Sequence, residues 1–224
     1  MSHAVLSHSV QPQSSTVSGM RVFVTFVLVA WLALIFLLGS REVFVAPRGT
    51  PPRPILIALA VPIIVFLVAF WVSNSFREYV LTADLRFMTS MQAWRFGGFA
   101  FLALMTYSIL PGYFAWPAGL GDMAIGITAP WILFAMIRRP SFAAGKTFLV
   151  WNVFGLLDLI VAVSIGAFGP RLFASGAVGA VKTSAMAYLP LVLVPAYLVP
   201  MFIILHVTAL FQARRFGGQL RGER

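Results

Sequence analysis

Two side chains that can gain or lose a proton lie deep inside apolar stretches of this sequence. Asp158 lies near the middle of the apolar run Trp151–Ala162, and His206 lies in the next apolar run. An ionisable residue inside a membrane-spanning segment is costly, and such residues commonly mark functional sites. A low dielectric disfavours the charged carboxylate, and imidazole titrates near neutral pH. The sequence therefore predicts that Asp158 and His206 carry protons within the membrane.

Three further polar residues are predicted to bind a substrate beside this pair. At a helical rise of about 1.5 Å per residue, Asn152 and His206 lie roughly 8 Å inside their runs, and Asp158 lies roughly 16 Å inside, near the bilayer centre. Arg95 is expected at the cytoplasmic edge, where its guanidinium could hold an anionic group. Asp122 is expected at the outer mouth of the bundle, next to the aromatic residues of an uncharged loop.

Each of these residues also has a purely structural interpretation. Asp158 and Asn152 could form hydrogen bonds between helices, and His206 could bond a carbonyl freed by a proline. Arg95 could be an anchor at the level of the lipid head groups. Asp122 directly precedes an apolar run and is typical of a helix N-cap. Asn152 and Asp158 are about 240° apart around a helix, so they are not expected to share a face.

The composition indicates that lipid is the main solvent of this chain. Of the 224 residues, 60% are hydrophobic and only 10% are charged, against roughly a quarter charged in soluble domains. The net charge is +10, and the basic residues lie between apolar runs. This distribution predicts contact with anionic lipid head groups and not with nucleic acid.

Several chemistries are not expected of this sequence. The absence of cysteine excludes disulfides, thiolate catalysis and iron–sulfur clusters. The sequence contains no phosphate-binding or dinucleotide-binding glycine motif. It also contains no pair of histidines four residues apart that would bind zinc on one helix face. We therefore predict neither a metal nor a cofactor.

Six apolar runs predict an all-α membrane protein, a bundle of about six transmembrane helices. A disordered N-terminal tail is expected at 1–20, a transmembrane domain at 21–211 and a basic cytoplasmic tail at 212–224. The predicted spans are 22–38, 54–73, 96–110, 123–137, 147–168 and 187–211.

The distribution of basic residues predicts the orientation of the bundle. Eleven Lys and Arg residues fall on the side that holds both termini, and five fall on the other side. Because cytoplasmic loops are enriched in Lys and Arg, both termini are predicted to be cytoplasmic, in the inner membrane of a bacterial-type cell. Pro190, Pro195 and Pro200 predict a broken last span, a feature often found at transporter sites.

Three functions are compatible with these residues. The first is movement of a small solute or a proton through the bundle, with Asp158 and His206 titrating. The second is a membrane-embedded enzyme that uses the same pair as acid and base on a lipid-phase substrate. The third is a non-catalytic subunit or assembly factor, whose polar groups and small residues bind partner helices.

Overall fold

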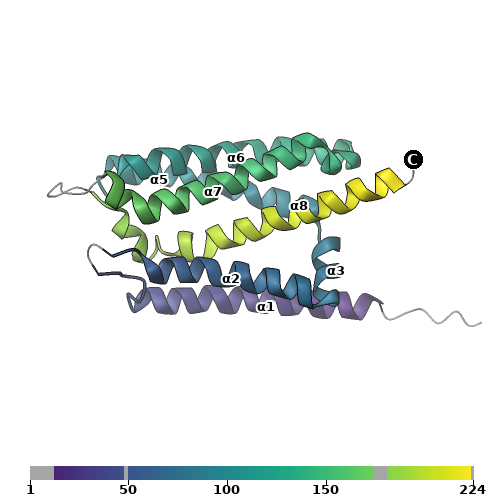
Figure 1. Cartoon of the computed structure of the whole chain (residues 1–224), viewed down its shortest axis with the longest axis horizontal. Coiled ribbons are helices and arrows are strands. Elements are labelled where there is room, and N and C mark those ends of the chain that lie inside the picture. Colours follow the sequence, from purple (N-terminus) through teal and green to yellow (C-terminus); the bar gives the residue numbers. More distant parts are fainter. Residues whose placement is uncertain (1–12, 48–49, 174–180, 223–224) are drawn as a thin grey trace, which may run out of the picture.

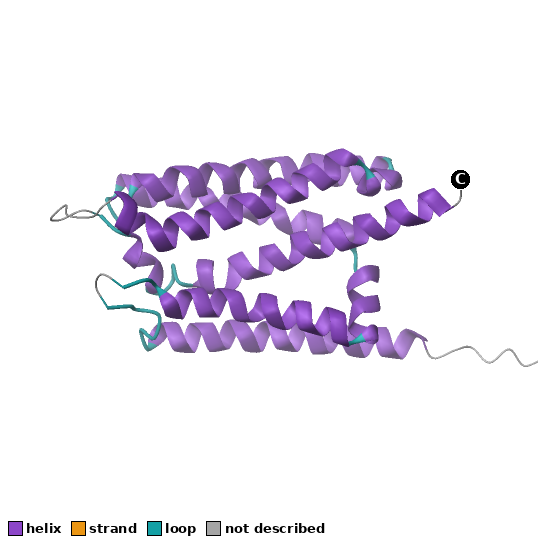
Figure 2. Ribbon diagram, viewed as in Figure 1, coloured by secondary structure: helices purple, strands orange, loops and turns teal. Residues whose placement is uncertain are grey.

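The computed structural model describes residues 13–47, 50–173 and 181–222. Helices make up nearly all of the secondary structure in these ranges, and none of them contains a strand (Figure 2). Five stretches are long and apolar enough to cross a membrane: α1 (Gln13–Ser40), α2 (Arg53–Val72), α6 (Gly112–Arg138), α7 (Lys146–Phe173), and α8 (Val199–Gly222) together with the preceding π-helical turn η4 (Val194–Leu198).

The outward faces of these helices carry large apolar side chains that no part of the described chain covers. Phe26, Val65, Trp131 and Phe154 are each more than half exposed. Water-soluble proteins rarely expose contiguous apolar surface on this scale, whereas lipid chains would cover it. The length and the apolar surface of these helices are consistent with an integral membrane protein.

The long helices form two pairs with α8 between them. In Figure 1, α1 and α2 lie along one side, α6 and α7 lie along the other, and α8 contacts both α2 and α7. The beginning of α1 and the C-terminus lie at the same end of the bundle (Figure 1). The α1–α2 connection lies at the opposite end.

Between α2 and α6 the chain is divided into short helical pieces. These are α3 (Asn74–Thr82), α4 (Leu85–Met91), the 3₁₀ helix η1 (Gln92–Gly98) and α5 (Phe99–Thr106). The Asp84 carboxylate caps α4 by accepting hydrogen bonds of 2.9 and 3.2 Å from two backbone N–H groups of its first turn, a contact typical of an N-cap aspartate. α4, η1 and α5 each pack against α6, and α5 is seen beside it in Figure 1.

The predicted third and fourth spans differ from the helices observed. The third, 96–110, begins inside η1, and the α-helical part α5 ends at Thr106. The fourth was expected to begin at residue 123, but α6 begins at Gly112. Asp122 is therefore not an N-cap, and Pro111 occupies that position. The error arose from Pro117, which a bundle tolerates inside a membrane helix because neighbouring helices satisfy the freed carbonyl.

The ends of the chain are more helical than expected, and the last span begins later. Residues 1–12 of the predicted tail lie outside the described residues, whereas 13–20 belong to α1. The predicted basic tail continues α8 as far as Gly222, because each added helical residue gains a backbone bond at little cost. At the last span, the π-helical turn η4 begins at Val194 and the α-helix α8 begins at Val199, and not at residue 187, since Pro190 cannot donate a helical hydrogen bond.

Candidate functional site

The buried side chain of Arg95 lies at the centre of the predicted site. It is 0% exposed. Its Nε donates to Asp122 Oδ1 on α6 at 2.7 Å, and one terminal nitrogen donates to Asp158 Oδ2 on α7. The other terminal nitrogen donates to the Gly155 carbonyl oxygen at 3.2 Å and contacts His206 Nε2 at 3.0 Å. The guanidinium therefore links η1 to α6, α7 and α8.

This position contradicts the expected place of Arg95 at the cytoplasmic edge. Its partner Asp158 is twelve residues from the start of α7 and fifteen from the end. The Arg95 guanidinium therefore lies level with the middle of α7. Arg95 reaches this depth because η1 packs along α6 and turns its buried face, with Gln92, Arg95 and Gly98, toward the neighbouring helices. Arg95 is one of the eleven basic residues counted on the side of both termini, so one of these eleven belongs to the core of the bundle.

His206 and Asn152 form a relay of hydrogen bonds behind Arg95. A guanidinium can only donate, so His206 Nε2 accepts, and Nδ1 carries the proton. Nδ1 then donates to Asn152 Oδ1 at 2.9 Å, and Asn152 Nδ2 donates to the Phe148 carbonyl oxygen at 2.9 Å. Both side chains are buried. The imidazole in this arrangement is neutral, and both of its nitrogens are occupied.

The predicted Asp158–His206 pair is joined through Arg95. Across the described ranges, no direct hydrogen bond links the two side chains, and each instead contacts a terminal nitrogen of the same guanidinium. Asn152, which bonds His206, and Asp158 point in different directions from α7, as the helical spacing predicted. The long side chain of Arg95, with its branched guanidinium, spans that difference, and the predicted site did not include this link.

The Arg95 cluster, defined here as Arg95, Asp122 and Asp158, has an unbalanced charge. One guanidinium faces two carboxylates, so the cluster carries a net charge of minus one when both acids are ionised. Their side chains are 17% and 10% exposed, respectively. Because a net charge in a low dielectric is costly, the cluster favours the addition of one proton or one cation.

Two glycines on the neighbouring helices, which were not among the predicted site residues, leave room for these contacts. A Cβ at Gly155 would lie 3.2 Å from the Arg95 terminal nitrogen and closer still to the His206 ring. A Cβ at Gly121 would overlap the Asp158 carboxylate. The sequence contained a signal for Gly155, because it lies three residues from both Asn152 and Asp158 and so falls between them on α7.

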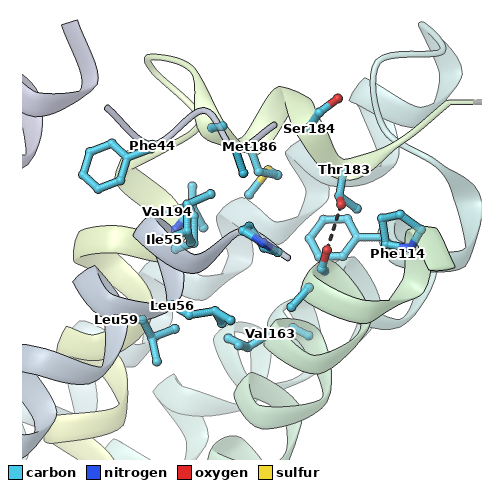
Figure 3. A pocket seen from close by; sticks show the side chains of 18 of the residues that line it. Phe44, Ile55, Leu56, Leu59, Phe114, Val163, Thr183, Ser184, Met186 and Val194 are labelled. Atoms are coloured by element: carbon cyan, nitrogen blue, oxygen red, sulfur yellow. Dashed lines mark hydrogen bonds between the residues drawn. The ribbon is translucent and has the colours of Figure 1, made fainter. Parts of the chain in front are cut away.

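A cavity of about 350 Å³ extends from one end of the bundle to Asp122. Its walls are mostly apolar and come from α2, α6, α7 and η4 (Figure 3). Its mouth lies near the α1–α2 connection, the end opposite the C-terminus, and carries polar side chains. Thr183 there donates a hydrogen bond of 2.8 Å to the Gly166 carbonyl oxygen on α7. Asp122 is the polar residue that lines the cavity at depth, and the residues around the mouth are Thr50, Arg171, Lys182, Thr183 and Ser184.

We expect Asn152→Leu to destabilise the protein by about 1–3 kcal/mol, because the substitution leaves the buried His206 Nδ1–H without an acceptor. Thermal unfolding in detergent, followed by tryptophan fluorescence, measures this loss. Ser164→Ala is the matched control on α7, since the exposed Ser164 hydroxyl bonds only the Ile160 carbonyl of its own helix at 2.7 Å. Equal stability of both variants would contradict the relay.

The fold and the site define a helical protein whose long helices are apolar enough to span a membrane, with a charged cluster between them. Residues 52–214 match the family described as Domain of unknown function (DUF8737), and the chain belongs to this family. The match begins just before α2 and contains every residue of the Arg95 cluster, together with Asn152 and His206. No curated protein and no solved structure matches the chain.

Proposed function

We propose that this protein is a proton-linked carrier of a small solute, in which the Arg95 cluster exchanges a bound proton for the solute. One observation carries this proposal: a buried guanidinium holds two carboxylates from different helices, and one of them, Asp122, lines a cavity that opens at one end of the bundle. A site with one excess negative charge and an access route is suited to alternate binding of a proton and a solute.

The roles of the predicted site residues follow from their contacts. Asp122 and Asp158 share the exchangeable proton, because each can lose its ion pair with Arg95 when protonated. His206 is a positioning residue in this scheme, since accepting a proton at Nε2 would break its bond to Arg95. Asn152 fixes the imidazole by accepting from Nδ1. This scheme replaces the predicted Asp158–His206 proton pair with a pair of aspartates.

Two interrupted segments next to the cluster support a carrier. Arg95 lies on the 3₁₀ helix η1, and the π-helical turn η4 contributes Val194 and Pro195 to the cavity wall. Discontinuous helices near the midplane commonly form transporter sites, and π-helical turns frequently occur at functional positions. Such segments can change backbone conformation at less cost than continuous helix, as alternating access requires.

The proposal includes a topology with six crossings in the inner membrane. Placed end to end, α4, η1 and α5 extend roughly 36 Å at the rises of α and 3₁₀ helices, which is enough to cross the ~30 Å hydrocarbon core. An even number of crossings places both termini on one side. The Lys and Arg excess assigns that side to the cytoplasm, where the basic residues meet anionic lipid head groups.

The contacts give less support to the other two functions. An enzyme that uses Asp158 and His206 as acid and base requires both groups to face one substrate, whereas Arg95 lies between them. A partner-binding subunit was expected to present small residues outward. Two pairs of small residues at a spacing of four, Ala93/Gly97 and Ala162/Gly166, are the candidates for such a contact. Ala162 and Gly166 line the cavity, whereas Gly97 does face open space.

Proteoliposomes test the carrier function directly. Vesicles containing a trapped pH-sensitive dye are supplied with a panel of small cations, anions and neutral solutes under an imposed pH gradient. We expect at least one solute class to dissipate the gradient through the wild-type protein. Asp122→Asn and Asp158→Asn should each reduce this flux to the rate of empty vesicles, because neither neutral cluster can exchange a proton.

The two variants should still fold, since each retains one Arg95–carboxylate pair and carries no net charge in the cluster. Glu78→Gln is the matched control, because it removes a carboxylate whose ion pair with Arg215 lies on the surface. Wild-type flux in both aspartate variants, or no flux for any solute in the wild type, would refute the proposal.

A further inference from the structure

We infer that the solute is a monovalent cation with an apolar body, which lies in the cavity with its charge at Asp122. This inference rests on the proposed function and specifies its substrate class. Two features of the cavity carry the inference together: the sign of the charge at its deep end and the apolar character of its walls.

The deep end of the cavity offers an unused acceptor to a cation. Arg95 bonds Oδ1 of Asp122, and within the described ranges Oδ2 makes no hydrogen bond. The Asp122 side chain is 17% exposed, against 10% for Asp158 and 0% for Arg95. Because the ionised cluster carries a net charge of minus one, an anion at this position would be repelled, and a single positive charge would neutralise the cluster.

The walls of the cavity require a ligand that is apolar apart from this charge. Leu56, Leu59, Phe114, Val163 and Val194 project toward the space between α2, α6, α7 and η4 (Figure 3). A small, fully hydrated cation would lose its water shell here without gaining replacement oxygen ligands. A cation with hydrocarbon or aromatic substituents instead gains contact with these side chains along its length.

The basic residues at the mouth do not reverse this charge preference. Arg171 is thirteen residues along α7 from Asp158, which corresponds to roughly 20 Å. Lys182 lines the same mouth. Charges at the solvent end are screened over about 8 Å at physiological ionic strength. The field at Asp122 is therefore determined by the Arg95 cluster.

The exchange step balances in charge and in protons. In the resting cluster, one proton is shared by Asp122 and Asp158, and the net charge is zero. Arrival of the cation at Asp122 Oδ2 is accompanied by release of that proton to the cavity, so that the cluster with its ligand is again neutral. No covalent bond other than the carboxyl O–H bond breaks.

The test compares two ions of the same shape and opposite charge. The full chain in lipid nanodiscs is titrated with tetraphenylphosphonium or with tetraphenylborate, and heat and proton release in weak buffer are recorded. We expect saturable binding of the phosphonium, with about one proton released per ion bound. Asp122→Asn should weaken this binding at least tenfold and abolish proton release, whereas Glu78→Gln should change neither.

A second variant tests the cavity without altering the cluster. Val163→Trp fills the space beside α7, so we expect it to prevent phosphonium binding while thermal unfolding remains cooperative. Unchanged phosphonium binding in this variant would overturn the location of the site. Preferential binding of tetraphenylborate, weakened by Lys182→Gln, would overturn the inference in favour of an anionic amphiphile held at the mouth.

The outcomes also separate this inference from the carrier function. If phosphonium fails to bind while a different solute dissipates the pH gradient in proteoliposomes, the carrier function stands and the inference is wrong. If phosphonium binds with proton release but no solute dissipates the gradient, the cation site stands and the carrier function is wrong.

Discussion

Arg95→Leu should destabilise the protein by about 3–5 kcal/mol, the usual effect of removing one partner from a buried ionic group. Leu removes every hydrogen bond that links η1 to Asp122, Asp158, Gly155 and His206. Two largely buried carboxylates then remain without a positive charge beside them. Thermal or denaturant unfolding in detergent measures the loss, with Arg215→Leu as the control, because the Arg215–Glu78 pair is exposed.

A combined variant separates the effect of the unpaired charges on stability from the effect of the lost packing. When Asp122→Asn and Asp158→Asn accompany Arg95→Leu, no uncompensated charge remains in the cluster. We expect this triple variant to recover a substantial part of the lost stability, since buried ionic groups can often be replaced together at little cost. If the triple variant is less stable than Arg95→Leu alone, repulsion between the carboxylates is not the cause of the destabilisation.

Gly126→Ala should be the most disruptive single-methyl substitution near the site. A Cβ at Gly126 would lie 2.8 Å from the Arg95 carbonyl carbon and 2.8 Å from Phe96 Cα, and closer still to the Phe96 nitrogen. These are backbone atoms of η1, so no side-chain rotation relieves the overlap. Overpacking typically costs about 1–3 kcal/mol, and we expect the upper end of this range together with displacement of Arg95.

Gly97→Ala is the matched control for this substitution. Gly97 belongs to η1 itself, but an added Cβ there has nothing within 4 Å. Ala reduces the conformational freedom of the unfolded chain, so this variant should be neutral or slightly more stable. Unfolding temperatures and proton-linked flux in proteoliposomes distinguish the two variants. Equal behaviour would show that α6 does not hold η1 in place through Gly126.

The site residues were identifiable from residue type and depth, but their connection was not. Asp158, His206 and Asn152 stood out because polar groups in apolar runs are costly. Arg95 and Asp122 drew attention as polar residues at the ends of predicted spans, and both were placed too near the membrane surface. The prolines and glycines around them are typical of loops in soluble proteins, whereas inside a bundle they permit close helix contact.

The sequence alone determined that this is an all-helical chain whose helices are apolar enough for a membrane, because composition and run length depend only on the order of residues. The tertiary structure decided that η1 packs along α6 with Arg95 on its buried face, and that the Arg95 guanidinium joins residues 122, 158 and 206. Such a junction depends on how helices far apart in the chain pack. That packing is set by contacts between backbones at glycines such as Gly126, which local sequence patterns do not encode.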